Sequence, residues 1–559
     1  MTLAIPADRR GAEPARRRHP VPLTERRRAL LVLVALGGAF LAEGAQLSRL
    51  ALEARGAPKS SQVEPLARSA ARPDIVDRRG RLLATDIAVP SLFADPARVV
   101  DADDASEQLA AILPSLDAGQ LRRELAEKSR RFLWIKRGIS PGEAQRIHEL
   151  GLPGIGFRTE LRRVYPVGQS AAHILGFVDV ENRGTTGIEA YIDKSGGLEI
   201  VDGPVRSTRL PIALSIDLSV QHALRAELVA AMARYATTAA AGLVLDVRTG
   251  EVLAASSLPD YEAGNARASL EPENIDRLVK GTYELGSVFK TVTLALASEA
   301  GQIAPGKLYD ARTPLPAGSV MIDDFHPTRR MLTAEGVFLH SSNIGAAQMA
   351  LEAGAERQRE LLARIGLTGT LHTEIGDTGR PRLPDPWQKV STMTVAYGHG
   401  IAVAPLQFAA GTAVLFNGGR PLQPTFLRVP ADPAVVPAKS VLKSETVDLM
   451  RQLMQRNVQS KEGTGGRAAV AGYDVGGKTG TADIPGKAGY GANGVLASFL
   501  AILPSRSPRY LIYVLLWEPK ATAASDSSTA AGLNAAPTAG RIIERVAPLL
   551  ELPPEASAG

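Results

Sequence analysis

The chain contains no cysteine among its 559 residues. This absence excludes disulfide bonds, cysteine-ligated zinc and a catalytic thiol. Histidine is also scarce, and none of the eight histidines falls in an H-E-x-x-H or similar metal-ligand spacing. The sequence therefore implies neither a metal nor a cofactor.

The body of the chain has almost no net charge, although the whole chain carries a formal net charge of +6. Residues 1–28 contain eight arginines and three acidic residues, which accounts for most of that excess. Aromatic residues make up only 5% of the chain, and basic patches interleaved with aromatics are not apparent. The composition therefore argues against nucleic-acid binding.

No uninterrupted apolar run reaches the roughly 20 residues that a membrane-spanning helix prefers. The run over residues 29–42 comes nearest, and it approaches that length if Glu43 lies at the far interface. A buried soluble helix fits poorly with the arginines before it, and Ala42-Glu43-Gly44 is a poor signal-peptide cleavage site. We expect an uncleaved transmembrane signal anchor over residues 29–48, with residues 1–28 as a cytoplasmic basic tail.

The length predicts two or more further domains. We expect a pedestal domain over residues 49–205, with a strand, glycine turn and strand at 74–84 and helices at 105–113, 118–129 and 140–150. The second domain is expected over residues 206–555. Its predicted elements are strands at 212–217, 495–503 and 510–517, a hairpin of 240–245 and 251–257, helices at 218–234, 286–300 and 539–550, and a low-complexity loop at 521–531. This order indicates an α+β (mixed) fold: an antiparallel sheet flanked by helices, with a helical subdomain.

Three short motifs carry chemistry. Ser287 and Lys290 lie three residues apart, so on a helix the hydroxyl and the amine project from one face. A serine needs a neighbouring base to become a nucleophile, and an unprotonated lysine can serve. Ser341-Ser342-Asn343 adds a hydroxyl and an amide, and Lys478-Thr479-Gly480-Thr481 adds an ammonium and two hydroxyls. Each motif recurs by chance, but their order and spacing predict one acyl-transfer site.

The trio resembles the serine motifs of penicillin-binding proteins. The surrounding sequence resembles the division-specific branch of the class B penicillin-binding proteins over about residues 25–550. The resemblance includes Asp77-Arg78-Arg79-Gly80, Arg163-Val164-Tyr165-Pro166 and Gly187-Ile188-Glu189 in the pedestal. Ser341-Ser342-Asn343 differs from the S-D-N of class A β-lactamases, and it favours a division role because elongation-type relatives usually carry aspartate at position 343.

The resemblance implies a serine-type D-alanyl-D-alanine transpeptidase that cross-links peptidoglycan and is inhibited by β-lactams. Ser287 is the implied nucleophile, Lys290 its base, Ser341 a proton relay, Asn343 an orienting group and Lys478 a source of positive field. The implied substrate-binding residues are Thr479, Gly480 and Thr481. The backbone N–H groups of Ser287 and Thr481 are the implied oxyanion donors, and His326, His340 and His399 are expected to be scaffold or groove residues.

The same resemblance implies a single-pass protein of the cell inner membrane, with a periplasmic catalytic domain at the division septum. Implied partners are stem peptides on lipid-linked or nascent glycan strands, β-lactams, and division-complex membrane proteins including a septal glycosyltransferase of the FtsW type. Alternatives are an elongation-specific class B transpeptidase, a β-lactamase or carboxypeptidase, and a β-lactam sensor or scaffold without turnover.

Overall fold

The computed structural model describes residues 31, 34, 36–46, 68–202, 207–318, 320–430, 438–484 and 494–554. Packing divides the chain into two units, residues 1–67 and 68–559. In the first unit residues 36–46 are helical, and across the described residues no helix combines the length and apolarity needed to cross a bilayer. The predicted tail over 1–28, parts of the anchor over 29–48, and residues 49–67 and 203–206 lie outside the described residues, so the anchor and the domain boundaries stay predictions.

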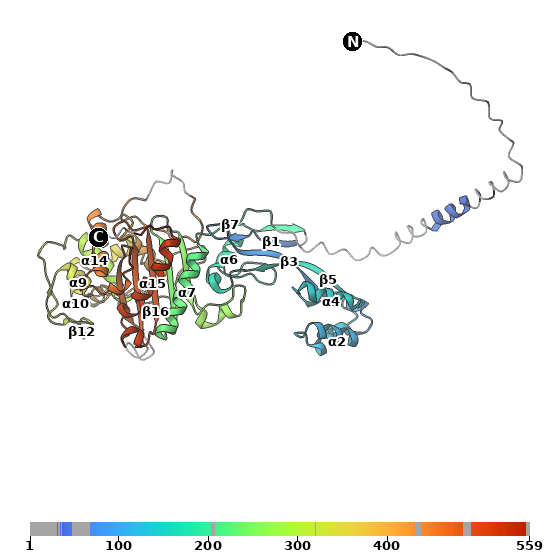
Figure 1. Cartoon of the computed structure of the whole chain (residues 1–559), viewed down its shortest axis with the longest axis horizontal. Coiled ribbons are helices and arrows are strands. Elements are labelled where there is room, and N and C mark those ends of the chain that lie inside the picture. The colour runs from blue at the N-terminus through green and yellow to red at the C-terminus, as the bar shows by residue number, and fades with distance from the viewer. Residues whose placement is uncertain are drawn as a thin grey trace, which may run out of the picture. The chain divides into compact units, whose positions relative to one another are not determined.

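The first part of the second unit contains the three predicted pedestal helices (Figure 1), α2 (Ala102–Ile112), α3 (Ala118–Ala126) and α4 (Pro141–Glu149). Each begins at a side chain that accepts hydrogen bonds from the first turn. Asp101 caps α2, Asp117 caps α3, and Ser140 forms the predicted capping box with Glu143 on α4. These caps explain why the helices begin where the sequence indicates.

A long strand organises this region. β3 (Leu82–Ala94) pairs along one edge with β5 (Ile155–Val164) over ten residue pairs. Its other edge pairs with β2 (Ile75–Val76) and β4 (Leu133–Lys136), and β7 (Ile212–Ala213) continues the sheet beyond β2. The remaining elements are β1 (Arg68–Ala71) paired with β6 (Glu199–Asp202), α5 (Ala172–Leu175), α6 (Gly187–Lys194) and the 3₁₀ turns η1 (Pro96–Arg98) and η2 (Gly168–Ala171).

The predicted strand at 212–217 was too long, because only Ile212 and Ala213 are strand. The Ser215 N–H donates to the Phe426 carbonyl instead, and Asp217 caps the next helix, α7 (Leu218–Tyr235). The chain therefore leaves the pedestal sheet within four residues. From residue 218 on it forms the part that contains the three sequence motifs, which is called the catalytic part below.

The catalytic part is built on a five-stranded sheet in the order β14-β15-β16-β8-β9, with every neighbouring pair antiparallel. Its strands are β8 (Ala239–Asp246), β9 (Val252–Leu258), β14 (Gly476–Asp483), β15 (Val495–Leu503) and β16 (Tyr510–Trp517). All residues of β8 and β16 are buried, so these strands read as continuous apolar runs rather than alternating ones. The predicted hairpin and the two late strands are confirmed.

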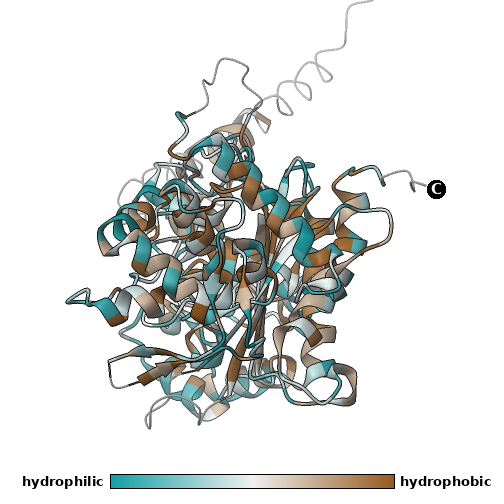
Figure 2. Ribbon diagram, turned by 90° about the vertical axis from the view of Figure 1, so that its left-hand side faces the viewer, coloured by the Kyte–Doolittle hydropathy of each residue, from teal (hydrophilic) through white to brown (hydrophobic). Residues whose placement is uncertain are grey.

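Helices cover both faces of this sheet. On one face α7 and α15 (Ala535–Leu549) form one apolar core with the strands. On the other face α8 (Lys290–Glu299) belongs to a second core, and the hydrophobic residues in Figure 2 concentrate in the strands and the helix sides turned toward them. The other elements are α9 (Ala334–Leu339), α10 (Asn343–Ala353), α11 (Ala355–Arg364), α12 (Lys389–Val395), α13 (Pro405–Ala413), α14 (Ser444–Gln459), β10 (Tyr309–Asp310), β11 (Leu315–Ala317), β12 (Val320–Ile322), β13 (Met331–Leu332) and the 3₁₀ turns η3 (Ala268–Leu270), η4 (Pro272–Asn274), η5 (Gly286–Phe289), η6 (Gly466–Ala468), η7 (Ala523–Ser525) and η8 (Ala531–Leu533).

Two predicted boundaries were wrong in detail. The helix expected at 286–300 begins as the 3₁₀ turn η5 and becomes α-helical only at Lys290. The loop expected at 521–531 contains η7 and the first residue of η8. Both segments lie beside β14, where tight turns bring the backbone close to the sheet.

The run at residues 77–81 joins the pedestal to the catalytic part. Arg79 Nε and Arg81 Nη2 each donate to the buried Asp217 carboxylate at 2.7 Å, and Asp77 accepts from the Leu218 N–H at 3.1 Å. Hydrogen bonding from Arg81 and from backbone N–H groups outweighs burial, the largest single effect, and lowers the pKa of Asp77. The N-terminus of α7 is therefore held by pedestal side chains.

A second ionic cluster is buried inside the pedestal itself. Glu189 accepts from Arg72 Nε and from Arg163 Nε, both at 2.7 Å, and Arg163 also lies 3.3 Å from Asp86. All four side chains are at most 1% exposed. Burying these charges is favourable only because each has an opposite charge in hydrogen-bonding geometry.

We predict that Glu189→Ala destabilises the protein by about 3–5 kcal/mol, because the substitution leaves two buried guanidinium groups without their shared carboxylate. Thermal or urea unfolding of the purified protein would measure this. Glu160→Ala, which breaks the more exposed pair with Arg137, is the matched control and should cost about 1 kcal/mol or less. Equal losses in the two variants would contradict the assignment.

Candidate active site

The three sequence motifs meet at the amine of Lys290. Its Nζ lies 2.6 Å from Ser287 Oγ, 2.7 Å from Asn343 Oδ1 and 2.8 Å from the Ser341 carbonyl oxygen. Ser341 Oγ lies between two amines, 3.2 Å from Lys290 Nζ and 3.1 Å from Lys478 Nζ. Residues 287, 341 and 478 are far apart in the sequence, so the fold itself assembles this constellation.

Two glycines allow the backbone segments to approach. Gly286, just before the nucleophile candidate, has φ +62°, and a Cβ there would lie 2.4 Å from the Thr481 carbonyl oxygen. A Cβ on Gly480 would lie 2.6 Å from Ser498 Oγ and 2.7 Å from the Leu285 carbonyl oxygen. Only glycine permits this contact of η5 with β14, which explains why Gly286 precedes Ser287 and why Gly480 lies between the threonines.

The second motif is held by a carboxylate outside it. Ser342 Oγ accepts from the Gly345 N–H and so caps α10, and it donates to the buried Asp324 carboxylate at 2.8 Å. Asp324 also accepts from the Ile344 N–H at 3.0 Å. The backbone of Ser341 has φ +56°, an uncommon conformation that these contacts keep in place. Sequence reasoning did not assign this role to Asp324.

Both lysines are completely buried. Burial lowers the pKa of Lys290 well below its usual value, the nearby Lys478 lowers it further, and Asp324 opposes the shift. Burial also lowers the pKa of Lys478 to about 7. Burial and the neighbouring cation therefore both favour the neutral form of Lys290, and Lys478 is only partly charged near neutral pH.

This result qualifies the expectation that Lys478 supplies a positive field. Its charge is not permanent in the empty cleft, because a buried ammonium without a carboxylate partner is unfavourable. A carboxylate arriving in the cleft would favour the charged form and raise its pKa again. The positive field is therefore expected to strengthen when an anionic ligand binds.

The hydrogen bonds around Lys290 match a neutral amine. A neutral amine has two N–H groups and one lone pair. The Ser341 carbonyl and Asn343 Oδ1 can only accept, so they take the two N–H groups. The lone pair is then directed to Ser287 Oγ at 2.6 Å, where it can accept the hydroxyl proton. This is the geometry of a serine nucleophile beside its general base.

These groups open into a cleft of about 850 Å³ lined by Ser287, Ser341, Asn343, Thr479 and Thr481. β14 forms one edge of the five-stranded sheet, so one side of its backbone does not pair with another strand of that sheet. An extended peptide could hydrogen bond to such an edge. Thr479 Oγ1 lies 2.7 Å from Thr464 Oγ1, and Thr481 Oγ1 accepts from the Ala531 N–H, which fixes both hydroxyls.

Three histidines line the same cleft: His326, His340 and His399. His340 Nε2 lies 2.5 Å from Arg330 Nη2, on the side of the second motif. Burial lowers the pKa of His399, and the Glu284 carboxylate partly offsets this effect. All three histidines therefore lie in the groove, where the sequence predicts them.

Comparisons with known proteins agree with this arrangement. A family model described as "Penicillin binding protein transpeptidase domain" matches residues 240–544, and "Penicillin-binding Protein dimerisation domain" matches residues 67–195. The "Probable peptidoglycan D,D-transpeptidase FtsI" of Caulobacter vibrioides is 38% identical, covering 86% of this chain and 81% of the relative. The "Peptidoglycan D,D-transpeptidase FtsI" of Escherichia coli K12 is 29% identical, covering 87% of this chain and 85% of the relative.

Among solved structures, penicillin-binding protein 2X of Streptococcus thermophilus shares the fold. The TM-score is 0.69 at 20% sequence identity, and the match covers 87% of this chain and 81% of that chain. The mixed α/β fold with its two matched domains is therefore confirmed.

We predict that Gly286→Ala lowers the rate of acylation by a fluorescent penicillin at least about 100-fold, because a side chain there pushes η5 away from β14 and misplaces the nucleophile. Gly301→Ala is the matched control, since Gly301 also has a positive φ (+71°) but faces open space. Loss of acylation in both variants would point to backbone strain instead of the contact with Thr481.

The pH dependence of acylation tests the state of Lys290. Only neutral Lys290 can accept the Ser287 proton, so the rate should fall as the pH drops through the lowered pKa of Lys290. Lys478→Met removes a neighbouring cation, so the pKa of Lys290 and the acid limb of the profile should move to higher pH. Lys389→Met, at an exposed site on α12, should leave the profile unchanged, and an unmoved limb in Lys478→Met would contradict the coupling.

Proposed function

The chain belongs to the penicillin-binding protein transpeptidase family, and from this membership we propose that it is the class B peptidoglycan D,D-transpeptidase of the division septum. The observation that carries the proposal is the 2.6 Å contact between Ser287 Oγ and the buried amine of Lys290. The similarity to relatives named FtsI from two organisms supports the division role.

In the first step, Ser287 Oγ attacks the carbonyl carbon of the D-alanyl-D-alanine bond of a stem peptide and gives its proton to Lys290 Nζ. The C–N bond then breaks, and the leaving D-alanine amine receives a proton through Ser341, whose hydroxyl lies within reach of both lysines. The backbone N–H groups of Ser287 and Thr481 stabilise the oxyanion, and each such donor is worth about 3–4 kcal/mol. The product is an ester on Ser287.

In the second step, the amine of a neighbouring stem peptide attacks the ester carbonyl. Lys290 accepts the proton that the attacking amine loses and passes it to Oγ as the C–O bond to Ser287 breaks, and a new amide cross-links the two peptides. Thr479, Gly480 and Thr481 bind the donor peptide along β14. The Thr479 and Thr481 hydroxyls hold its terminal carboxylate, and Lys478 behind them supplies the positive field. A β-lactam occupies the same position and acylates Ser287 without a leaving group that departs.

The proposal includes the predicted topology. Residues 29–48 anchor the protein in the inner membrane as a single-pass helix, with residues 1–28 in the cytoplasm and the catalytic part in the periplasm. Partners are stem peptides on lipid-linked or nascent glycan strands and division-complex membrane proteins, including a septal glycosyltransferase of the FtsW type. The arginine-rich flank of the apolar run supports this orientation.

We predict that Ser287→Ala abolishes both penicillin acylation and cross-linking of purified lipid-linked substrate, because in the described part of the chain no other hydroxyl lies as close to Lys290. Ser298→Ala, near the C-terminal end of α8, is the control and should retain both activities. Cross-linking that survives Ser287→Ala would disprove the mechanism. Penicillin acylation without cross-linking by the unchanged protein would favour a sensor.

The division role has its own test. Depletion of the protein should give filamentous cells, and a fluorescent fusion should localise to mid-cell. Rounded cells with lateral signal would instead support an elongation enzyme.

A further inference from the structure

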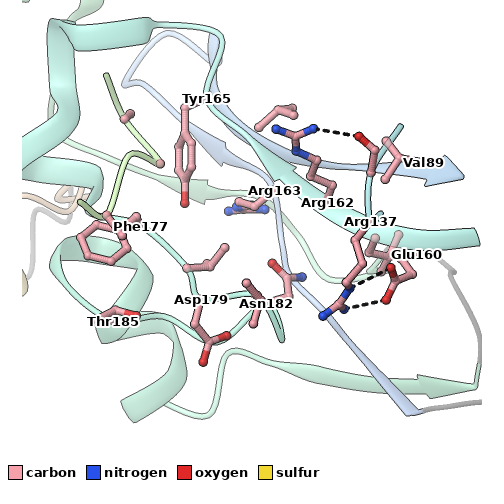
Figure 3. A pocket seen from close by; sticks show the side chains of 18 of the residues that line it. Val89, Arg137, Glu160, Arg162, Arg163, Tyr165, Phe177, Asp179, Asn182 and Thr185 are labelled. Carbon is pink, nitrogen blue, oxygen red and sulfur yellow. Dashed lines mark hydrogen bonds and ion pairs between the residues drawn. The ribbon is translucent and has the colours of Figure 1, made fainter. Parts of the chain in front are cut away.

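A second large cavity lies outside the catalytic cleft, between the pedestal sheet and residues 263–266 of the catalytic part. Its volume is about 850 Å³. Figure 3 shows Tyr165, Phe177, Asp179 and Asn182 around Arg163 at one end of the cavity, with Val89 and the paired Arg137 and Glu160 at the other end. None of these residues takes part in the chemistry proposed above.

This cavity follows the free edge of β5. Consecutive side chains of a strand point to opposite faces, yet all residues from Glu160 to Tyr165 line the cavity. A cavity lined from both faces has to pass around the edge of the strand. The opposite edge of β5 is occupied by β3 along its whole length.

The backbone of this edge is open. In the described part of the chain, only β3 forms backbone hydrogen bonds with residues 159–164. In an antiparallel pair every second residue directs its N–H and C=O away from the partner strand. Such an edge is a template for another extended chain, because only a polypeptide backbone offers donors and acceptors at the same repeat.

The side chains beside this edge determine which residues an added strand should carry. Arg137 is paired with Glu160 at 2.6 Å, but the exposed Arg162 donates only a long 3.5 Å hydrogen bond to the Gly138 carbonyl among the described residues. Across the cavity Val180 is 74% exposed. The mouth therefore presents Arg162, a positive charge without an ion pair among the described residues, and one exposed apolar side chain. It also presents the Asp179 carboxylate, which accepts the Glu181 and Arg183 N–H groups at 2.9 Å.

We propose that this cavity binds an extended segment of a partner protein, which adds to the pedestal sheet as a strand beside β5. The segment alternates apolar residues with acidic ones, so that a carboxylate faces Arg162 and an apolar side chain faces Val180. A second copy of the chain is a poorer occupant, because a two-fold interface has to be self-complementary and two concave grooves do not fit each other.

The cavity lies between the pedestal and the catalytic part, so a bound segment would contact both. A bound strand contacts β5 of the pedestal and Ala263–Ala266 of the catalytic part at once. Gly264 lies so close to Tyr165 that a Cβ there would be 3.0 Å from its ring. The partner segment therefore bridges the two parts and holds them in one arrangement. This inference does not depend on the proposed transpeptidase activity.

The test uses the full-length protein in detergent and three fluorescein-labelled heptapeptides: alternating valine and glutamate, alternating valine and lysine, and the glutamate peptide with a central proline. Fluorescence polarisation should show binding of the glutamate peptide, with at least about tenfold weaker binding of the other two. Hydrogen exchange of the amides at 159–164 should slow when that peptide is bound. Absence of binding, or binding without this protection, would overturn the proposal.

A charge-reversal variant sharpens the test. Arg162→Glu should weaken binding of the glutamate peptide about tenfold and favour the lysine peptide, whereas Arg146→Glu, at an exposed site on α4 outside the cavity, should change neither. Penicillin acylation at the unchanged rate shows that each variant is folded. Unchanged peptide preference in Arg162→Glu would overturn the proposal, as would protection of residues 159–164 by concentration-dependent dimerisation without peptide.

Discussion

Two buried lysine amines share one serine hydroxyl, and the rest of the catalytic part is arranged around that contact. Lys290 Nζ and Lys478 Nζ lie 3.2 and 3.1 Å from Ser341 Oγ, and neither amine has a carboxylate in an ion pair among the described residues. Repulsion and burial both favour proton loss, so the pair can be buried only if at least one amine is neutral. The unfavourable environment of the charge is thus what makes Lys290 a base.

Two buried amines stay this close together only if the surrounding structure prevents them from moving apart. Lys290 begins α8, the Ser341 carbonyl precedes α10, and Lys478 lies in β14, so three separate elements have to hold their positions. The left-handed backbone of Ser341 and the close approach of Gly286 to Thr481 are the points of greatest constraint. Strain of this kind is retained where packing on both faces of a sheet over-determines the backbone, as it does here.

The sequence was sufficient to predict which residues meet beside the cleft but not the charges on them. The order of the motifs predicted that Ser287, Lys290, Ser341, Asn343 and Lys478 lie close together, and the structure places them so. The prediction was possible because each motif contains its own turn or cap residue. The reduced charge of Lys478 could not be predicted, since its pKa depends on burial from segments remote in sequence. Asp324 was missed for a related reason: it lies 18 residues before the serine that it binds, in no recognisable motif.

In the pedestal, too, features set by neighbouring residues could be predicted, whereas features set by residues remote in the sequence could not. Ser140 and Glu143 alone are enough to predict where α4 begins. The strand predicted at 212–217 is shorter than expected because Asp217 binds Arg79 and Arg81 of the pedestal, and these two residues are remote in the sequence. Asp217 also accepts from the Ser219 N–H, so one buried carboxylate both caps α7 and binds the pedestal. Since α7 packs directly on β9 and the Asp217 N–H donates to the Leu253 carbonyl, any rotation of the pedestal has to disturb the edge of the catalytic sheet. A ligand on the pedestal is therefore mechanically connected to the sheet whose opposite edge, β14, carries Lys478.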